Sequence, residues 1–135
     1  IRSYMDETVS FAKSNGYVQT LFGRKIHTPE INAKGPGAGF AKRAAINAPI
    51  QGTSADIIKR AMARMGPALG DAGLGHVRML LQVHDELVFE LPKGDVDAAS
   101  KVIEAVMVGA AEPAVKLSVP LGVDIGTGAS WGAAH

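Results

Sequence analysis

The stretch "LLQVHDELVFEL", residues 80–91, decides the fold of this chain, because three consecutive titratable residues separate its two apolar runs. The residues on either side are rich in the branched aliphatic side chains that favour strands. Between the runs stand His84, Asp85 and Glu86, without the Gly or Asn that most tight turns use. The pattern predicts a β-hairpin over residues about 77–91, with the three titratable side chains at its bend.

The bend of this hairpin is the first candidate for chemistry. Because strand side chains alternate between faces, Asp85 is expected on one side, with His84 and Glu86 roughly on the other. A turn without Gly is conformationally costly, and strain at a polar turn is more often tolerated where it positions a reacting group. A carboxylate at a hairpin tip suits Mg²⁺, although one carboxylate cannot build a two-metal site. Spacing alone leaves a metal ligand and an ordinary solvated hairpin end both open.

Composition places the chain among ordinary globular proteins. It has 135 residues, of which 47% are hydrophobic and 20% charged, which suits one domain or a large piece of one. The absence of cysteine excludes disulfides and thiolate metal sites and agrees with a reducing compartment, so we expect a cytoplasmic protein. No apolar run approaches the ~20 residues that cross a bilayer. Because the chain starts at Ile1 rather than Met, we expect a processed or excised piece.

The net charge of +1 conceals an asymmetry between the two halves. Residues 1–64 contain ten Lys and Arg against four Asp and Glu, a formal charge of +6. Residues 65–135 contain four basic and nine acidic residues, a formal charge of −5. The division indicates either a polyanion-facing surface joined to a cation-binding one or a chance partition of solvated surface.

Other elements follow from periodicity, β-propensity and the placement of Gly and Pro. The helix that contains Pro49 is expected as one kinked helix or as two nearly continuous ones, with Thr53 or Ser54 capping a restart. Asp95 is expected to cap the following amphipathic helix. The order predicts an α+β fold with an antiparallel sheet. The expected elements are a helix over 1–15, a hairpin over 17–29, a loop over 32–39, the long kinked helix over about 40–65, the amphipathic helix over about 95–112 and a final edge strand over about 118–126.

Two long motifs carry a specific resemblance. "QVHDELVFE" (82–90) resembles the third catalytic motif of family A DNA polymerases, the bacterial DNA polymerase I group. "RAAINAPIQGTSADIIKRAM" (43–62) resembles the long helix that precedes that motif in the family. "GYVQTLFGRK" (16–25), "VPLGVDIG" (119–126) and the stretch Trp131–His135 also match, so the resemblance covers essentially the whole chain.

The resemblance implies a C-terminal, incomplete part of a polymerase domain. Residues 1–39 would form a fingers helix, hairpin and loop, and residues 40–135 the kinked helix and the remainder of the palm with its antiparallel sheet. Asp85 would be one of two metal-binding catalytic aspartates of the palm. Glu86 would be the adjacent acid with a lesser role, and His84 would lie against the primer strand near its 3′ end.

The long helix would contact newly made duplex through Arg43, Asn47 and Gln51, according to the same resemblance. These residues lie at i, i+4 and i+8, roughly one helical stripe, and all three can donate hydrogen bonds. Every Watson–Crick pair presents acceptors in the minor groove, so donors there sense pair geometry without reading sequence. A solvated helix face is the alternative for three isolated polar residues.

The implied function is that of a DNA-directed DNA polymerase acting in replication and repair, by two-metal nucleotidyl transfer with Mg²⁺. Its partners would be primer–template DNA and deoxynucleoside triphosphates, without a membrane, and the full-length enzyme is expected to be monomeric. The family's second catalytic aspartate and its nucleotide-handling Lys and Tyr lie upstream and have no counterpart here, so we expect the isolated chain to be inactive. The alternatives are a phosphohydrolase with a His84–Asp85 metal dyad and a non-catalytic nucleic-acid-binding module.

Overall fold

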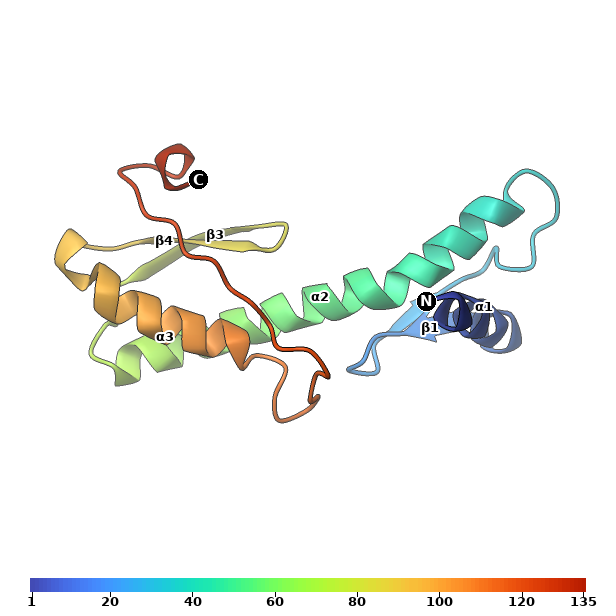
Figure 1. Ribbon diagram of the computed structural model, residues 1–135, viewed down its shortest axis with the longest axis horizontal. Coiled ribbons are helices and arrows are strands. Elements are labelled where there is room, and N and C mark those ends of the chain that lie inside the picture. The colour runs from blue at the N-terminus through green and yellow to red at the C-terminus, as the bar shows by residue number, and fades with distance from the viewer. The chain divides into compact units, whose positions relative to one another are not determined.

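The computed structural model describes residues 1–135 and contains three α-helices and two separate two-stranded antiparallel sheets (Figure 1). The mixed helix-and-sheet class expected from the sequence is confirmed. The chain divides into two compact units, Ile1–Asp56 and Ile57–His135, and the second helix contributes residues to both. No helix is both long enough and apolar enough to cross a bilayer.

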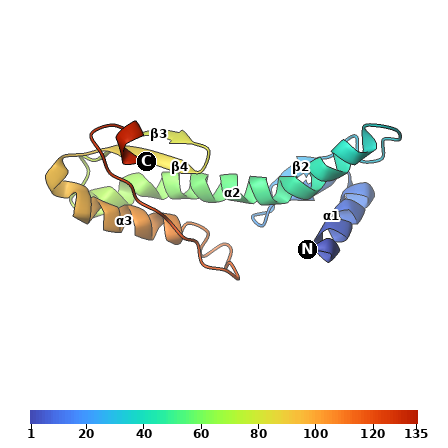
Figure 2. The same cartoon turned by 45° about the horizontal axis from the view of Figure 1, so that its top comes forward.

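The first unit packs one helix and a small hairpin against the start of a second helix (Figure 2). Helix α1 (Arg2–Asn15) ends at a left-handed Gly16, and strands β1 (Tyr17–Gln19) and β2 (Lys25–His27) pair antiparallel, as expected. Small and branched apolar side chains from these elements pack together to form the core of the first unit. The buried core residues of this unit are Ala12, Val18, Ile31 and Ala45.

Helix α2 (Ala38–Asp71) is a single helix of 34 residues that continues through Pro49. One of the two expected arrangements, a pair of helices with a capped restart, is therefore not observed. Instead of capping a restart, the Thr53 hydroxyl accepts a hydrogen bond from the backbone N–H of Leu21 at 3.0 Å. This side-chain hydrogen bond links α2 to the segment between β1 and β2.

The end of α2 corrects the expected boundary at residue 65. The helix runs through Pro67 to Asp71. Met65 and Leu69 are buried in the core of the second unit, and burying two large apolar side chains, at about 1.5–3 kcal/mol each, offsets the cost of about 3 kcal/mol for Pro67 in a helix. Tertiary packing therefore extends the helix beyond the point that local preference indicates.

The second unit packs a hairpin and a helix around the end of α2. Strands β3 (Arg78–Val83) and β4 (Glu86–Glu90) form the hairpin expected over residues about 77–91. The turn η1 (Lys93–Asp95) leads into α3 (Val96–Val108), which ends before Gly109 rather than near residue 112. The buried core residues of this unit are Met65, Leu69, Leu74, Val77 and Ala99.

Two expectations for this unit are wrong. The edge strand expected over about 118–126 does not form, because no strand of the chain offers it a hydrogen-bonded ladder and Pro120 has no N–H to donate. Asp95 makes no capping bond with α3. Its carboxylate lies 2.6 Å from His76 Nε2, a partner that the sequence did not indicate.

Candidate functional site

The hairpin tip is a two-residue turn rather than the three-residue bend that the sequence suggested. Val83 pairs with Glu86, so only His84 and Asp85 connect the strands. His84 has φ 53° and is the single non-glycine residue of the chain with a positive φ. The strain expected at this turn is confirmed, since a non-glycine residue in the left-handed region is uncommon. The Gln82 side-chain amide donates to the His84 carbonyl and braces the turn.

A β-bulge lies in β3 before the tip. Met79 faces Phe89 and Leu81 faces Val88, so Leu80 is an extra residue without a partner. A one-residue insertion reverses the face to which every later side chain of the strand points. The bulge therefore sets which side chains of β3 reach each face at the tip, and the uniformly apolar sequence around Leu80 gave no signal of it.

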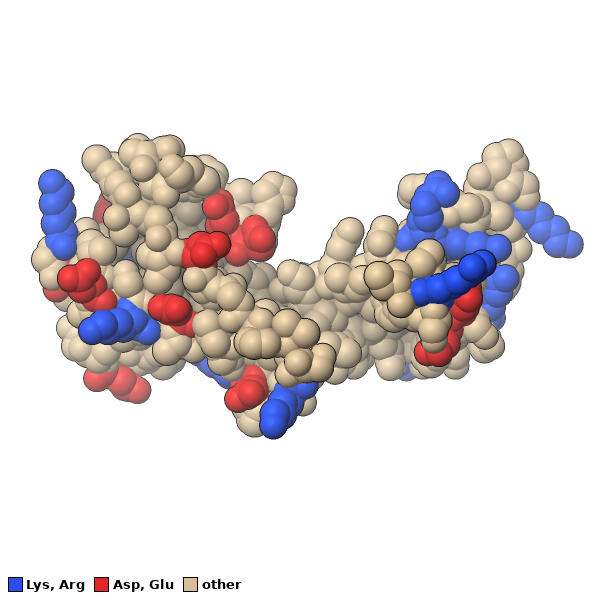
Figure 3. Space-filling view, viewed as in Figure 1, with Lys and Arg blue, Asp and Glu red and all other residues tan.

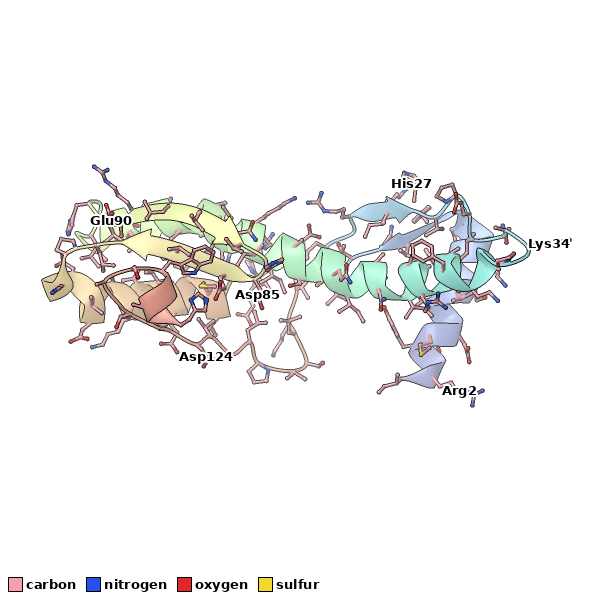
Figure 4. The ribbon with its side chains drawn as sticks, turned by 90° about the horizontal axis from the view of Figure 1, so that it is seen from above. Arg2, His27, Lys34, Asp85, Glu90 and Asp124 are labelled. Carbon is pink, nitrogen blue, oxygen red and sulfur yellow. The ribbon has the colours of Figure 1, made fainter.

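The Asp85 carboxylate is exposed at the end of the hairpin and makes no hydrogen bond or ion pair (Figure 4). No group of three or more His, Asp and Glu side chains in the chain could enclose a metal ion. Mg²⁺ is usually held in proteins through one or two carboxylates, with waters and phosphates completing its shell. A free carboxylate such as Asp85 fits one ligand position of that kind, and the others must come from elsewhere.

The neighbouring carboxylate of Glu86, unlike that of Asp85, has a hydrogen-bonding partner. Glu86 Oε1 lies 2.8 Å from His135 Nε2, and His135 Nδ1 lies 3.0 Å from the Trp131 carbonyl oxygen. The hydrogen bond to Trp131 and then the Glu86 carboxylate raise the pKa of His135 above 6.5. This pair could not be predicted from local sequence patterns, because 49 residues separate its members. The sole signal was that the stretch containing both Trp131 and His135 resembles the family.

The predicted DNA-contacting residues lie on one side of α2. Arg43, Asn47 and Gln51 are all exposed, and none of them makes a hydrogen bond or ion pair. Ala45, about 200° around the helix from Arg43, is buried in the core of the first unit. Their donors are therefore available to a ligand, as the sequence predicted for a stripe, although a solvated face would present them in the same way.

Part of the basic excess of the first half has structural partners. Arg24 Nε lies 2.6 Å from Asp56 Oδ1, and the buried Asp56 also accepts from Thr20 Oγ1 at 2.7 Å. Asp56 is thus a buried hydrogen-bond and ion-pair partner within the continuous helix α2. Arg60 and Arg64 donate to carbonyl oxygens at the end of α3, where cationic side chains are favoured.

The charges that remain at the surface differ between the two units. Lys34 projects from the loop before α2, and Lys and Arg gather over the first unit in Figure 3. That unit contains seven basic and four acidic residues, whereas the second unit contains seven and nine. The excess of positive charge is smaller than the sequence halves indicated, since the structural boundary falls before Lys59, Arg60 and Arg64.

Comparison with known proteins gives concordant matches. Residues 1–133 match the family model described as DNA polymerase family A. The chain is 51% identical to DNA polymerase I of Rhizobium leguminosarum, over all of the chain and 14% of that protein. It is 41% identical to the thermostable DNA polymerase I of Thermus aquaticus, over 97% of the chain and 15% of that protein.

A solved structure also resembles the chain. The POL domain of Pol1 from M. smegmatis, in complex with DNA primer-template and dNTP, superposes with a TM-score of 0.89 at 43% identity. The match covers 98% of this chain and 23% of that one. The chain therefore spans only a small part of the proteins that it matches, 14% and 15% of the two curated relatives named above.

Proposed function

Because this chain belongs to DNA polymerase family A, we propose that it is the C-terminal part of the polymerase domain of a template-directed DNA polymerase. Residues 1–39 would supply the last part of the fingers, and residues 40–135 the long helix and the rest of the palm. In the reaction, the primer 3′-OH attacks the α-phosphate of a deoxynucleoside triphosphate and pyrophosphate leaves. The partners would be primer–template DNA and nucleotide, the ligands named for the M. smegmatis relative.

The free carboxylate of Asp85 at a strained turn is the observation that carries the proposal. An unpaired carboxylate at the end of a braced hairpin can bind a cation without first breaking a protein contact. Bound Mg²⁺ would supply Lewis-acid activation of the primer hydroxyl and neutralise charge on the phosphate oxygens. Asp85 would hold one such ion, together with ligands from the rest of the polymerase and from the nucleotide.

The other site residues would bind and orient DNA. The exposed His84 imidazole would lie against the primer strand, and its turn would keep it beside Asp85. Arg43, Asn47 and Gln51 would donate hydrogen bonds to minor-groove acceptors that do not depend on sequence. Such contacts position the duplex while leaving the template free to specify the nucleotide.

We further propose that the isolated 135-residue chain does not polymerise DNA, since it offers one free carboxylate at the tip and no enclosed metal site. Two-metal catalysis needs acidic ligands on both ions. A primer-extension assay with the purified chain tests this directly, and templated incorporation would refute it. The cytoplasmic location and monomeric state of the longer enzyme stay predictions.

The decisive experiment replaces Asp85 by Asn in the longer polymerase that contains this segment. We expect primer extension to fall by more than about 10²-fold, as when a preorganised electrostatic group is lost, with DNA affinity unchanged within about twofold. Asp124→Asn, at another exposed carboxylate without a partner, is the matched control and should retain full activity. Undiminished extension by the Asp85→Asn variant would refute the assignment. A wild-type protein that binds DNA without extending it would favour the non-catalytic module.

A further inference from the structure

We propose that His135 is a positioning residue that holds the Glu86 carboxylate toward the C-terminal turn, so that Asp85 alone remains free at the hairpin tip. The structural part of this proposal concerns contacts within the second unit. Its catalytic consequence rests on the proposed polymerase function.

The two ring nitrogens of His135 define the interaction. Nε2 faces Glu86 Oε1 at 2.8 Å, and Nδ1 faces the Trp131 carbonyl oxygen at 3.0 Å. A carbonyl and a carboxylate oxygen can only accept, so both nitrogens must donate, which requires the doubly protonated imidazolium. The raised pKa of His135 agrees in direction with this geometry. Glu86 is therefore paired with a cation, whereas Asp85 is not.

The C-terminal turn is seated by backbone packing as well as by this pair. The turn η2 (Gly132–Ala134) lies beside the β3–β4 hairpin in Figures 1 and 2. The Ala134 N–H donates to the carbonyl oxygens of Ser130 and Trp131, each at 3.1 Å. A Cβ atom on Gly126 would overlap the backbone oxygen of Ala134, so the turn packs directly against a residue that must lack a side chain. This packing fixes where His135 leaves the turn.

Seating matters because an exposed ion pair stabilises little when two flexible side chains must be ordered to form it. The His135 and Glu86 side chains are 54% and 43% exposed. Since the turn already holds the imidazole in place, less side-chain freedom is lost on pairing. The contact can therefore orient Glu86 even though it is open to solvent.

The pairing changes the charge at the tip. Asp85 and Glu86 are adjacent carboxylates, and two unpaired like charges would repel each other and compete for the same cation. His135 compensates one of them and directs it toward the turn. Without His135, the Glu86 carboxylate would be free to rotate, and a second unpaired negative charge would lie beside Asp85.

The test is a double-mutant cycle in the longer polymerase, with His135→Ala, Glu86→Gln and the double variant. We expect His135→Ala to lower kcat about 3- to 10-fold with little change in the KM for DNA. In the Glu86→Gln background, the same replacement should change kcat by less than about 1.5-fold, because the uncharged amide no longer forms an ion pair with His135 and retains only a neutral hydrogen-bond acceptor. His135→Gln, which retains one donor, should recover part of the loss. Independent, multiplying effects would overturn the proposal.

A readout without metal or substrate tests the structural part. Hydrogen exchange at the amides of residues 84–87 should rise in both the His135→Ala and the Glu86→Gln variants, and unchanged exchange in either would overturn the proposal. Gly126→Ala keeps both His135 and Glu86 but displaces the turn that positions His135, so it should reproduce the kinetic effect of His135→Ala. His76→Ala is the matched control, because it removes the exposed His76–Asp95 pair of similar length elsewhere in the unit and should leave kcat unchanged.

The outcomes separate this inference from the proposed function. If Asp85→Asn abolishes extension while the effects of His135→Ala and Glu86→Gln multiply, the inference alone fails. If Asp85→Asn retains full activity, the proposed function fails, and the hydrogen-exchange comparison still decides whether His135 holds Glu86.

Discussion

Replacing Gly52 by Ala should destabilise the first unit, although the same change in most helices is stabilising. Gly52 lies inside α2 and is packed against the β1–β2 hairpin. A Cβ atom there would lie 2.7 Å from Thr20 Cγ2 and 2.9 Å from Ile26 Cδ1. Because carbon atoms pack best at about 3.5–4.0 Å, the hairpin must move by nearly an ångström to admit the methyl group.

Two opposing effects determine how much Gly52→Ala changes the unfolding free energy of the first unit. Ala in place of Gly in a helix interior contributes about 1 kcal/mol through backbone propensity. Overpacking a filled core costs about 1–3 kcal/mol, and the upper range applies here because Thr20 cannot move freely. Its hydroxyl donates to Asp56 at 2.7 Å and accepts from the N–H groups of Phe22 and Arg24, each at 3.2 Å. We expect a net loss of about 1–2 kcal/mol in the unfolding free energy of the first unit.

Native-state hydrogen exchange at the ladder amides of β1 and β2 measures this loss for the first unit separately from the second. The control is Gly70→Ala in the last turn of the same helix, where the new methyl group meets no atom within 4 Å. Because Gly70 belongs to the second unit, that change should stabilise the second unit by about 0.5 kcal/mol, measured at the ladder amides of β3 and β4, and leave exchange at β1 and β2 unchanged. If both substitutions stabilise, the close seating of the hairpin on Gly52 is wrong.

Three further results are expected. Met65→Ala should destabilise the second unit by about 2–5 kcal/mol in urea unfolding, because the side chain is fully buried, and a loss under about 1 kcal/mol would contradict that core. The fluorescence of Trp131, the single tryptophan, should report docking of the turn: since the pKa of His135 is raised on folding, docking is fully stabilised below about pH 6.5 and weakens as pH rises through the raised value. His135→Gln should abolish this transition, and a transition that persists would assign it to another group. Arg43→Ala in the longer polymerase should weaken duplex binding about 10-fold and equally across sequences, whereas a loss confined to some sequences would contradict minor-groove contact.

Local features of the sequence predicted most of the fold. The end of α1 at Gly16, both hairpins and the amphipathic α3 follow from signals contained within a few residues. The expected strand over about 118–126 had the right alternation, but a strand also needs a partner, and this segment pairs with neither of the two sheets, β1–β2 and β3–β4. The extension of α2 to Asp71 depends on burial in a core assembled from distant segments, which periodicity does not reveal.

In the candidate site too, local features could be predicted from the sequence, whereas features that depend on distant residues could not. The strained tip and the free donors on α2 could be inferred locally, because they depend on turn chemistry and helical spacing. The bulge at Leu80 and the partner of Glu86 could not, since the first lies in a uniformly apolar run and the second joins residues 49 positions apart. The burial of Asp56 could not be predicted either, because its partners Arg24 and Thr20 lie in the segment joining β1 to β2, 32 and 36 residues before it in the sequence.

The central claim is that the Asp85 carboxylate binds a catalytic metal ion, and metal-specific rescue tests it most directly. In the longer polymerase, Asp85→Cys places a soft thiolate where a hard oxygen ligand stood, and Asp85→Ser serves as the control without a thiolate. We expect both variants to be inactive with Mg²⁺ and only the Cys variant to regain nucleotide incorporation when a thiophilic ion such as Cd²⁺ is added. Equal behaviour of the two variants with every ion, or full activity of either with Mg²⁺, would contradict the claim.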